Sequence, residues 1–229
     1  MRNDAIAIFL STGALLVSAC TGVKQGWPEV TPDGLQRVDN TRFSTVYIKP
    51  DAELTTYKKF GVTDCFVALK ENWLRDQNTK RLNRFNRVSQ EDADRLTAAL
   101  GDECKSSFTT ALSQPPAHEV IETFNAGDKV LVLRPNIINL NINAPEIKSA
   151  SNIDHYTTSF GEMTLYLELL DGSTQDVLVR IIDRRKDAYD MRMWWSNGVT
   201  NKVSADRMLQ RWANQMREEL DKALDAQQQ

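Results

Sequence analysis

The chain has 229 residues, of which 41% are hydrophobic and 26% charged, a balance typical of folded globular proteins and too apolar for a disordered chain. Its 28 Lys and Arg residues and 31 Asp and Glu residues leave a net charge of −3, so electrostatics gives no basis for binding nucleic acid. The negative mean hydropathy excludes a protein with many membrane-spanning helices.

The N-terminal residues have the pattern of a signal peptide. Arg2 provides a short positive region, and residues 5–17 (AIAIFLSTGALLV) form an almost continuous apolar run. A run of this length is too short to span a bilayer, which needs about 20 residues. Residues 1–19 are therefore predicted to direct export and then to be removed.

The sequence Val17-Ser18-Ala19-Cys20 resembles the bacterial lipobox, in which small residues precede a cysteine. The resemblance implies cleavage before Cys20, a diacylglycerol thioether on its sulfur, and an acyl chain such as palmitate on its new amino group. Several acyl chains hold a protein firmly on a membrane, whereas one binds only marginally. Thr21 replaces the Asp that would favour the inner membrane, so we expect the periplasmic face of the outer membrane. The alternative is an ordinary secretory signal that contains a cysteine.

The mature chain is predicted to consist of a tether and one domain. Residues 20–40 contain several Gly and Pro residues without sustained periodicity, which indicates a lipidated, flexible tether. Residues 41–226 are expected to form a single periplasmic domain, and residues 227–229 a disordered tail.

Aromatic and β-branched content and alternating hydrophobicity predict five strands, at residues 43–49, 62–69, 129–143, 161–170 and 177–183. Pro135 is expected to bend the third strand or to place that part of it at a sheet edge. The turn Asp171-Gly172 between the last two strands predicts a hairpin.

Two amphipathic helices are predicted around these strands. The first begins after Ser89, which forms a capping box with Asp92, and it ends before Pro115 and Pro116. The second covers residues 204–226, and the charged segment 70–87 is also compatible with a helix, anchored by Trp73. The expected fold is α+β and sandwich-like: a mainly antiparallel five-stranded sheet with the two main helices on one face.

Two cysteines remain once Cys20 is lipidated. Cys65 lies in a strand-like run and Cys104 on the apolar face of the first helix, so a disulfide between them would join that helix to the sheet. The alternative is a pair of buried free thiols. There is no Cys-x-x-Cys motif, which excludes a thioredoxin-like redox site and a zinc ribbon.

The search for catalytic chemistry finds no constellation. His118 and His155 have no acid or nucleophile at a familiar spacing, and no phosphate loop, dinucleotide fingerprint or nucleophile elbow is present. Three carboxylates could be read as a metal site, but interleaved basic residues favour a solvated strand end; the carboxylates are Asp183, Asp187 and Asp190. We therefore predict no cofactor and no metal. The adjacent Arg184 and Arg185 could still recognise a partner.

Two further features could form a binding surface. Trp194 and Trp195 lie beside a turn, and because neighbouring side chains on a strand face opposite ways, one of them could be an exposed anchor. The alternative is that both pack beneath the last helix. A series of side-chain amides could bind a polar ligand or simply be solvated; its members are Asn136, Asn139, Asn141 and Asn143.

Several segments along the mature chain resemble an uncharacterised family of Gram-negative lipoproteins, domain of unknown function 3313. They are DGLQRV (33–38), TVYIKP (45–50), NWLRDQN (72–78), LRPNIINLNINAP (133–145), GEMTLYLELLD (161–171) and WANQMREELD (212–221). The resemblance implies a lipoprotein but brings no catalytic residues. The element order is also similar to small α/β domains of periplasmic accessory proteins, such as the curli-secretion lipoprotein, the N-terminal domain of the Tol translocation protein and lipoprotein activators of peptidoglycan synthases, which speaks to fold and not to function.

Two hypotheses of function follow. The first is a non-enzymatic accessory lipoprotein that binds an envelope protein or associates with itself. The alternative is a hydrolase or transferase acting on envelope polymers, with carboxylates that the sequence does not locate. Two carboxylates facing each other across a cleft would favour the second hypothesis.

Overall fold

The computed structural model describes residues 27–79, 87–123, 125, 128–142, 155–157, 161–186, 194–196 and 198–227. The predicted signal peptide, Cys20 and the first part of the predicted tether lie outside these residues. No helix in the described ranges is long and apolar enough to cross a membrane.

The described chain forms one eight-stranded sheet, with the strands in the order β1-β2-β9-β8-β6-β3-β5 and β4 beside β6. The strands are β1 (Gln36–Val38), β2 (Thr45–Ile48), β3 (Lys59–Val62), β4 (Phe66–Leu69), β5 (Glu119–Val120), β6 (Val130–Ile142), β8 (Gly161–Asp171) and β9 (Val177–Lys186). Neighbouring strands in the series β1-β2-β9-β8-β6 are antiparallel to each other. Strands β3 and β4 run parallel to β6, and β5 runs parallel to β3. The α+β class is confirmed.

The prediction of five strands is wrong in number, although each predicted strand overlaps an observed one. The predicted strand at residues 62–69 is divided: β3 pairs with β6 as far as Leu133, and β4 resumes the pairing at Asn136. Pro135, which has no backbone N–H, lies opposite this break. It therefore sits inside a central strand and not at a sheet edge. The short strands β1 and β5 have too few residues to show a periodicity.

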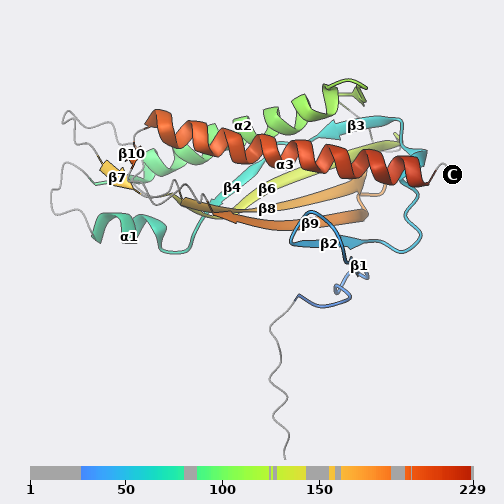
Figure 1. Ribbon diagram of the computed structural model, residues 1–229, viewed down its shortest axis with the longest axis horizontal. Coiled ribbons are helices and arrows are strands. Elements are labelled where there is room, and N and C mark those ends of the chain that lie inside the picture. The colour runs from blue at the N-terminus through green and yellow to red at the C-terminus, as the bar shows by residue number, and fades with distance from the viewer. Residues whose placement is uncertain are drawn as a thin grey trace, which may run out of the picture.

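Two long helices, α2 (Gln90–Ser113) and α3 (Gly198–Ala226), lie side by side and cover one face of the sheet (Figure 1). The predicted capping box is confirmed, because the Ser89 side chain accepts from the Asp92 backbone N–H and Asp92 accepts from that of Ser89. A short helix α1 (Trp73–Thr79) and a 3-10 turn (Leu54–Thr56) complete the described helical elements. Trp73 is buried, as predicted for its anchor role.

The main core lies between these two helices and the sheet. The predicted apolar stripe of α2 is buried, with Cys104, Phe108 and Leu112 fully inaccessible. Trp212 on α3 is also fully buried, and strands β6 and β8 contribute the facing layer. Burial of this apolar surface supplies the main driving force for the fold.

The predicted disulfide is present. Cys65, just before β4, is bonded to Cys104 on α2, with a Cα–Cα distance of 6.0 Å. Gly101 makes the close approach possible, because a Cβ atom there would lie 2.7 Å from the carbonyl oxygen of Cys65. One turn of helix later, Cys104 reaches its partner.

A separate two-stranded sheet pairs β7 (His155–Thr157) with β10 (Trp194–Ser196). His155 therefore lies in a strand. The side chains of His155, Trp194 and Trp195 lie outside the described residues, so both hypotheses for the tryptophan pair stay predictions.

Candidate functional site on the open face of the sheet

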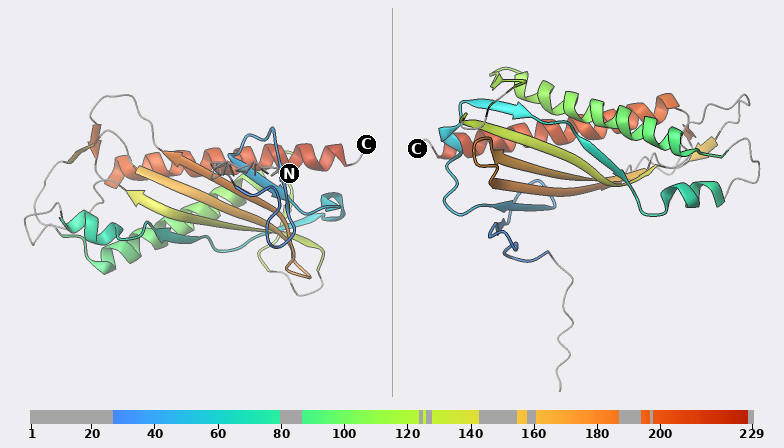
Figure 2. Two further views of the ribbon diagram at one scale, coloured as in Figure 1. Left: turned by 90° about the horizontal axis from the view of Figure 1, so that it is seen from below. Right: turned by 180° about the vertical axis from the view of Figure 1, so that it is seen from behind.

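The sheet has one face that no described helix covers, which we call the open face. In the left-hand view of Figure 2, β6, β8 and β9 lie in front of α2 and α3. Strand register identifies its residues, because directly paired residues point to the same face. One row across the sheet contains Phe66, Asn136, Tyr166 and Ile182, and a neighbouring row contains Arg134, Glu168 and Arg180.

A charge network occupies the centre of the open face. Glu168 is 5% exposed and accepts from Arg134 Nη2 at 2.6 Å and from Arg180 Nε at 2.9 Å. Tyr166 also donates its hydroxyl to Glu168, at 3.1 Å. Burial alone would raise the pKa of Glu168, but the two guanidinium groups outweigh it and hold the pKa below its usual range. The carboxylate is therefore charged at neutral pH.

Arg180 also fastens the N-terminal segment, residues 27–38, to one end of the open face. It donates to both carboxylate oxygens of Asp33, at 3.0 and 2.7 Å. Leu35 is 1% exposed and packs against Tyr47 and Ile182. These residues were predicted to belong to a flexible tether. The start of the folded domain is therefore earlier than predicted, because the buried Leu35 and the ion pair of Asp33 attach the segment to the sheet. Amino-acid composition alone does not reveal these contacts.

The remainder of the open face carries exposed apolar and cationic groups. Phe66 is 66% exposed, on a strand whose described pairing is with β6 alone. Arg134, in the next row and on the neighbouring strand β6, has 43% of its side chain exposed, and Arg184, on β9, has 67%. Arg184 pairs with Glu162, and this hydrogen bond holds the pKa of Glu162 below its usual range.

The two predicted arginines are separated by the sheet. Arg184 lies on the open face, whereas Arg185 lies beneath α3, where it donates to Asp183 Oδ2 at 2.9 Å and to Gln215 Oε1 at 2.7 Å. Its guanidinium also lies 5.5 Å from the centre of the Trp212 ring. Arg185 is therefore part of the packing under α3 and is not an accessible binding residue.

Asp183 does not lie at a solvated strand end, contrary to the interpretation made from the sequence. It is 6% exposed and accepts from Trp212 Nε1 at 2.7 Å and from the backbone N–H of Ser44 at 3.1 Å. Burial alone would raise its pKa, but these bonds and Arg185 lower it. The interpretation failed because α3, distant in sequence, covers this strand. Asp187 and Asp190 lie outside the described residues.

The remaining histidine has a local role. His118 Nε2 lies 2.9 Å from Asp221 Oδ1, and its ring lies 4.3 Å from that of Phe60, as expected for a satisfied histidine.

The predicted series of amides is also distributed by the fold. Asn136 donates to the carbonyls of Arg134 and Tyr166 at 3.3 Å, and Asn141 hydrogen-bonds Glu162. Asn139 is exposed at positive φ where the register of β6 shifts, and Asn143 is not described. No group of three potential metal ligands occurs among the described residues.

The open face therefore presents an exposed aromatic ring on β4 and two guanidinium groups that are exposed or partly exposed, on β6 and β9. Sequence reasoning missed Phe66, Tyr166 and Arg134. The sequence shows that residues on these strands alternate with apolar neighbours. This alternation does not show which face of the sheet the helices leave uncovered.

A family model described as a protein of unknown function (DUF3313) matches residues 30–216. A search of curated proteins finds no match. Among solved structures, the chain is similar to a dodecamer of a PelC point variant from Paraburkholderia phytofirmans, with 13% identity, a TM-score of 0.37, and coverage of 75% of this chain and 97% of the other. A second PelC dodecamer from that organism shows 13% identity, a TM-score of 0.36, and coverage of 75% and 94%.

Proposed function

The chain belongs to the DUF3313 family of proteins of unknown function, and we propose that it is a non-enzymatic accessory lipoprotein of the Gram-negative envelope. A lipid anchor on Cys20 holds the domain at the periplasmic face of the outer membrane. The open face of the sheet then binds an envelope protein located there. One observation carries the proposal: Phe66 is a largely exposed aromatic residue on a face that also presents the partly exposed Arg134 and the exposed Arg184.

Phe66 has the properties of an interface anchor. Because Phe66 is 66% exposed, its removal from water by a partner would lower the free energy of the complex. Aromatic residues and arginines are enriched in the parts of interfaces that dominate binding energy. The complementary partner surface would offer an apolar pocket for the ring and acidic groups opposite Arg134 and Arg184.

The contacts of the N-terminal segment favour an orientation in which the open face is turned toward the membrane. Its contacts fall on the open-face side, where Tyr47 donates its hydroxyl to the carbonyl of Pro28, and Asp33 binds Arg180. Six residues lie between Cys20 and Trp27, and the seven Cα–Cα steps that join these two residues span at most about 25 Å when fully extended. An anchored domain would thus keep its open face within reach of membrane-associated proteins.

Crosslinking in intact cells tests the partner. A photoreactive amino acid at position 66 of the full chain should give an adduct of defined mass, whereas the same group at Arg211, exposed on α3, should not. The Phe66→Ser variant should lose copurification of that partner, and Val30→Ser, at a residue 54% exposed, should retain it. An adduct of twice the chain's mass would identify a second copy. Equal labelling from both positions would contradict the proposal.

The anchor has an independent test. Cys20→Ala should abolish incorporation of labelled palmitate and leave a precursor or a released protein, and mass spectrometry of the wild-type N-terminal peptide should show the lipid. A mature N-terminus without lipid would refute the anchor without bearing on the open face.

A further inference from the structure

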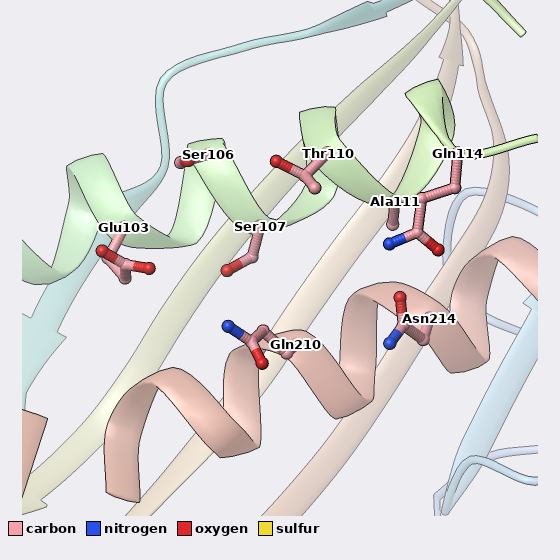
Figure 3. Close-up of a pocket in the computed structure, with 8 residues that line it drawn as sticks. All are labelled: Glu103, Ser106, Ser107, Thr110, Ala111, Gln114, Gln210 and Asn214. Carbon is pink, nitrogen blue, oxygen red and sulfur yellow. The ribbon is translucent and has the colours of Figure 1, made fainter. Parts of the chain in front are cut away.

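A polar pocket lies on the outer surface of the helix layer, on the opposite side of the domain from the open face. It encloses about 330 Å³ between α2 and α3 (Figure 3). Its lining comes from α2 through Glu103, Ser106, Ser107, Thr110 and Ala111, from the residue after α2, Gln114, and from α3 through Gln210 and Asn214. Because the helices lie side by side, two rows of short and amide side chains face each other along it.

The floor of the pocket contains an unsatisfied hydroxyl group. Ser107 is 7% exposed, and its Oγ has no hydrogen-bond partner among the described residues. In Figure 3 this oxygen points across the pocket toward Gln210. Buried polar side chains in native proteins nearly always have a protein, water or ligand partner, so a hydroxyl that faces a cavity without a protein partner marks a position where a bound molecule can form a hydrogen bond.

The chemistry of the lining identifies the class of that ligand. None of the eight described lining residues is Lys or Arg, which disfavours an anion, and a single carboxylate, Glu103, disfavours a metal ion. The other polar groups are neutral hydroxyls and amides, which both donate and accept hydrogen bonds. The lining carries one purely apolar side chain, Ala111, which disfavours a hydrophobic molecule.

We propose that this pocket binds a neutral sugar unit. A sugar ring presents several adjacent hydroxyls, each able to donate and to accept, and it matches a wall of neutral amides and hydroxyls. Gln114 and Asn214 point toward each other at one end of the pocket, and Ser107 and Gln210 at its middle (Figure 3). The volume is at the lower end of small-molecule sites, which suits one ring. This inference does not depend on the proposed function of the open face.

Ser107→Ala tests the proposal through two effects whose directions can be predicted, one on stability and one on sugar binding. Without ligand, Ser107→Ala should raise the melting temperature, because it removes an unpaired buried hydroxyl and places a better helix former in α2. With ligand, the same variant should bind sugar more weakly, by roughly 3- to 10-fold, the range that the loss of one hydrogen bond produces. Ser113→Ala is the matched control, because Ser113 is exposed on the same helix outside the pocket.

The experiment is a titration of the full mature chain in detergent micelles. Glucose, N-acetylglucosamine and cellobiose are added separately, and the side-chain amide signals of Gln114, Gln210 and Asn214 are followed by NMR. We expect a saturable shift with at least one sugar, weakened in Ser107→Ala and unchanged in Ser113→Ala and in Phe66→Ser. Tighter binding of cellobiose than of glucose would indicate that the ligand is the end of a glycan chain. Equal affinity for the two would indicate that the ligand is a free sugar.

Three results would overturn the proposal. They are the absence of a saturable shift for all three sugars up to about 50 mM, an unchanged affinity in Ser107→Ala, and equal shifts with inorganic phosphate or acetate. A lower melting temperature for Ser107→Ala would show that its hydroxyl already has a stabilising partner and would also count against the site. None of these outcomes depends on whether Phe66 binds a protein.

Discussion

The two faces of the sheet use buried charge in different ways. Beneath α3, Asp183 accepts hydrogen bonds from Trp212, Ser44 and Arg185 and is only 6% exposed. On the open face, Glu168 collects Arg134 and Arg180, but Arg134 remains 43% exposed. The first cluster holds a helix to the sheet. The second holds the N-terminal segment and leaves Arg134 partly exposed, so the same residue types serve packing on one face and, in the proposed function, recognition on the other.

The largest effect is expected from removing the carboxylate beneath α3. Asp183→Ala should lower the free energy of unfolding by about 3–5 kcal/mol, because it leaves a buried guanidinium and an indole N–H without their acceptor. Urea unfolding at pH 7 measures the loss. Asp183→Asn, which keeps one acceptor oxygen, should lose less. A loss for Asp183→Ala below that of Glu168→Ala would reverse the comparison between the two faces.

Loss of the disulfide should cost slightly less. Cys104→Ala is expected to reduce the free energy of unfolding by about 2–5 kcal/mol, because the unfolded chain regains the entropy of the loop between the two cysteines. Cys65→Ala is the matched variant. The double variant should lose little more than either single one, since the bond is already broken in each. Strictly additive losses would show that the two side chains stabilise the fold independently of the bond.

The ion pair between Asp33 and Arg180 should contribute less to the free energy of unfolding, because the Asp33 side chain is 44% exposed. Asp33→Asn is expected to cost about 0.5–1 kcal/mol at pH 7. Hydrogen bonds from Arg180 and Thr31 hold the pKa of Asp33 below its usual range, so the folded chain binds fewer protons than the unfolded chain does. The wild-type advantage should therefore be complete above about pH 5 and shrink as the pH falls below that value. Unfolding curves of both proteins from about pH 6 to about pH 2 measure it, and an advantage that grows in acid would be the wrong sign.

The smallest effect on stability is expected at the proposed recognition surface. Phe66→Ser should change the free energy of unfolding by less than about 0.5 kcal/mol, because the side chain is already largely in water. Phe60→Ser, at a residue 1% exposed, should cost several kcal/mol by comparison. Thermal unfolding of the two variants makes the comparison. A large loss for Phe66→Ser would place that ring in the core and remove the basis of the recognition surface.

Local pattern in the sequence was sufficient for much of the fold. Alternation located all the long strands among the described residues, the spacing of Ser89 and Asp92 predicted the start of α2, and the position of Cys104 on its apolar face predicted the disulfide. The segments shared with the DUF3313 family identified the family correctly. Each of these features depends on residues close together in the chain, or on a covalent pair with a single possible partner.

The tertiary structure alone decided which side of each strand became a surface. Alternation shows that Arg184 and Arg185 point to opposite faces, but not that α3 would bury Arg185 with Asp183 and leave Arg184 in water. It also could not show that the segment around Leu35 would pack on the sheet, or that Ser107 would face α3 across a pocket. Coverage of a face depends on elements far apart in sequence, because the apolar area that they bury together, and not the local pattern, determines where they pack.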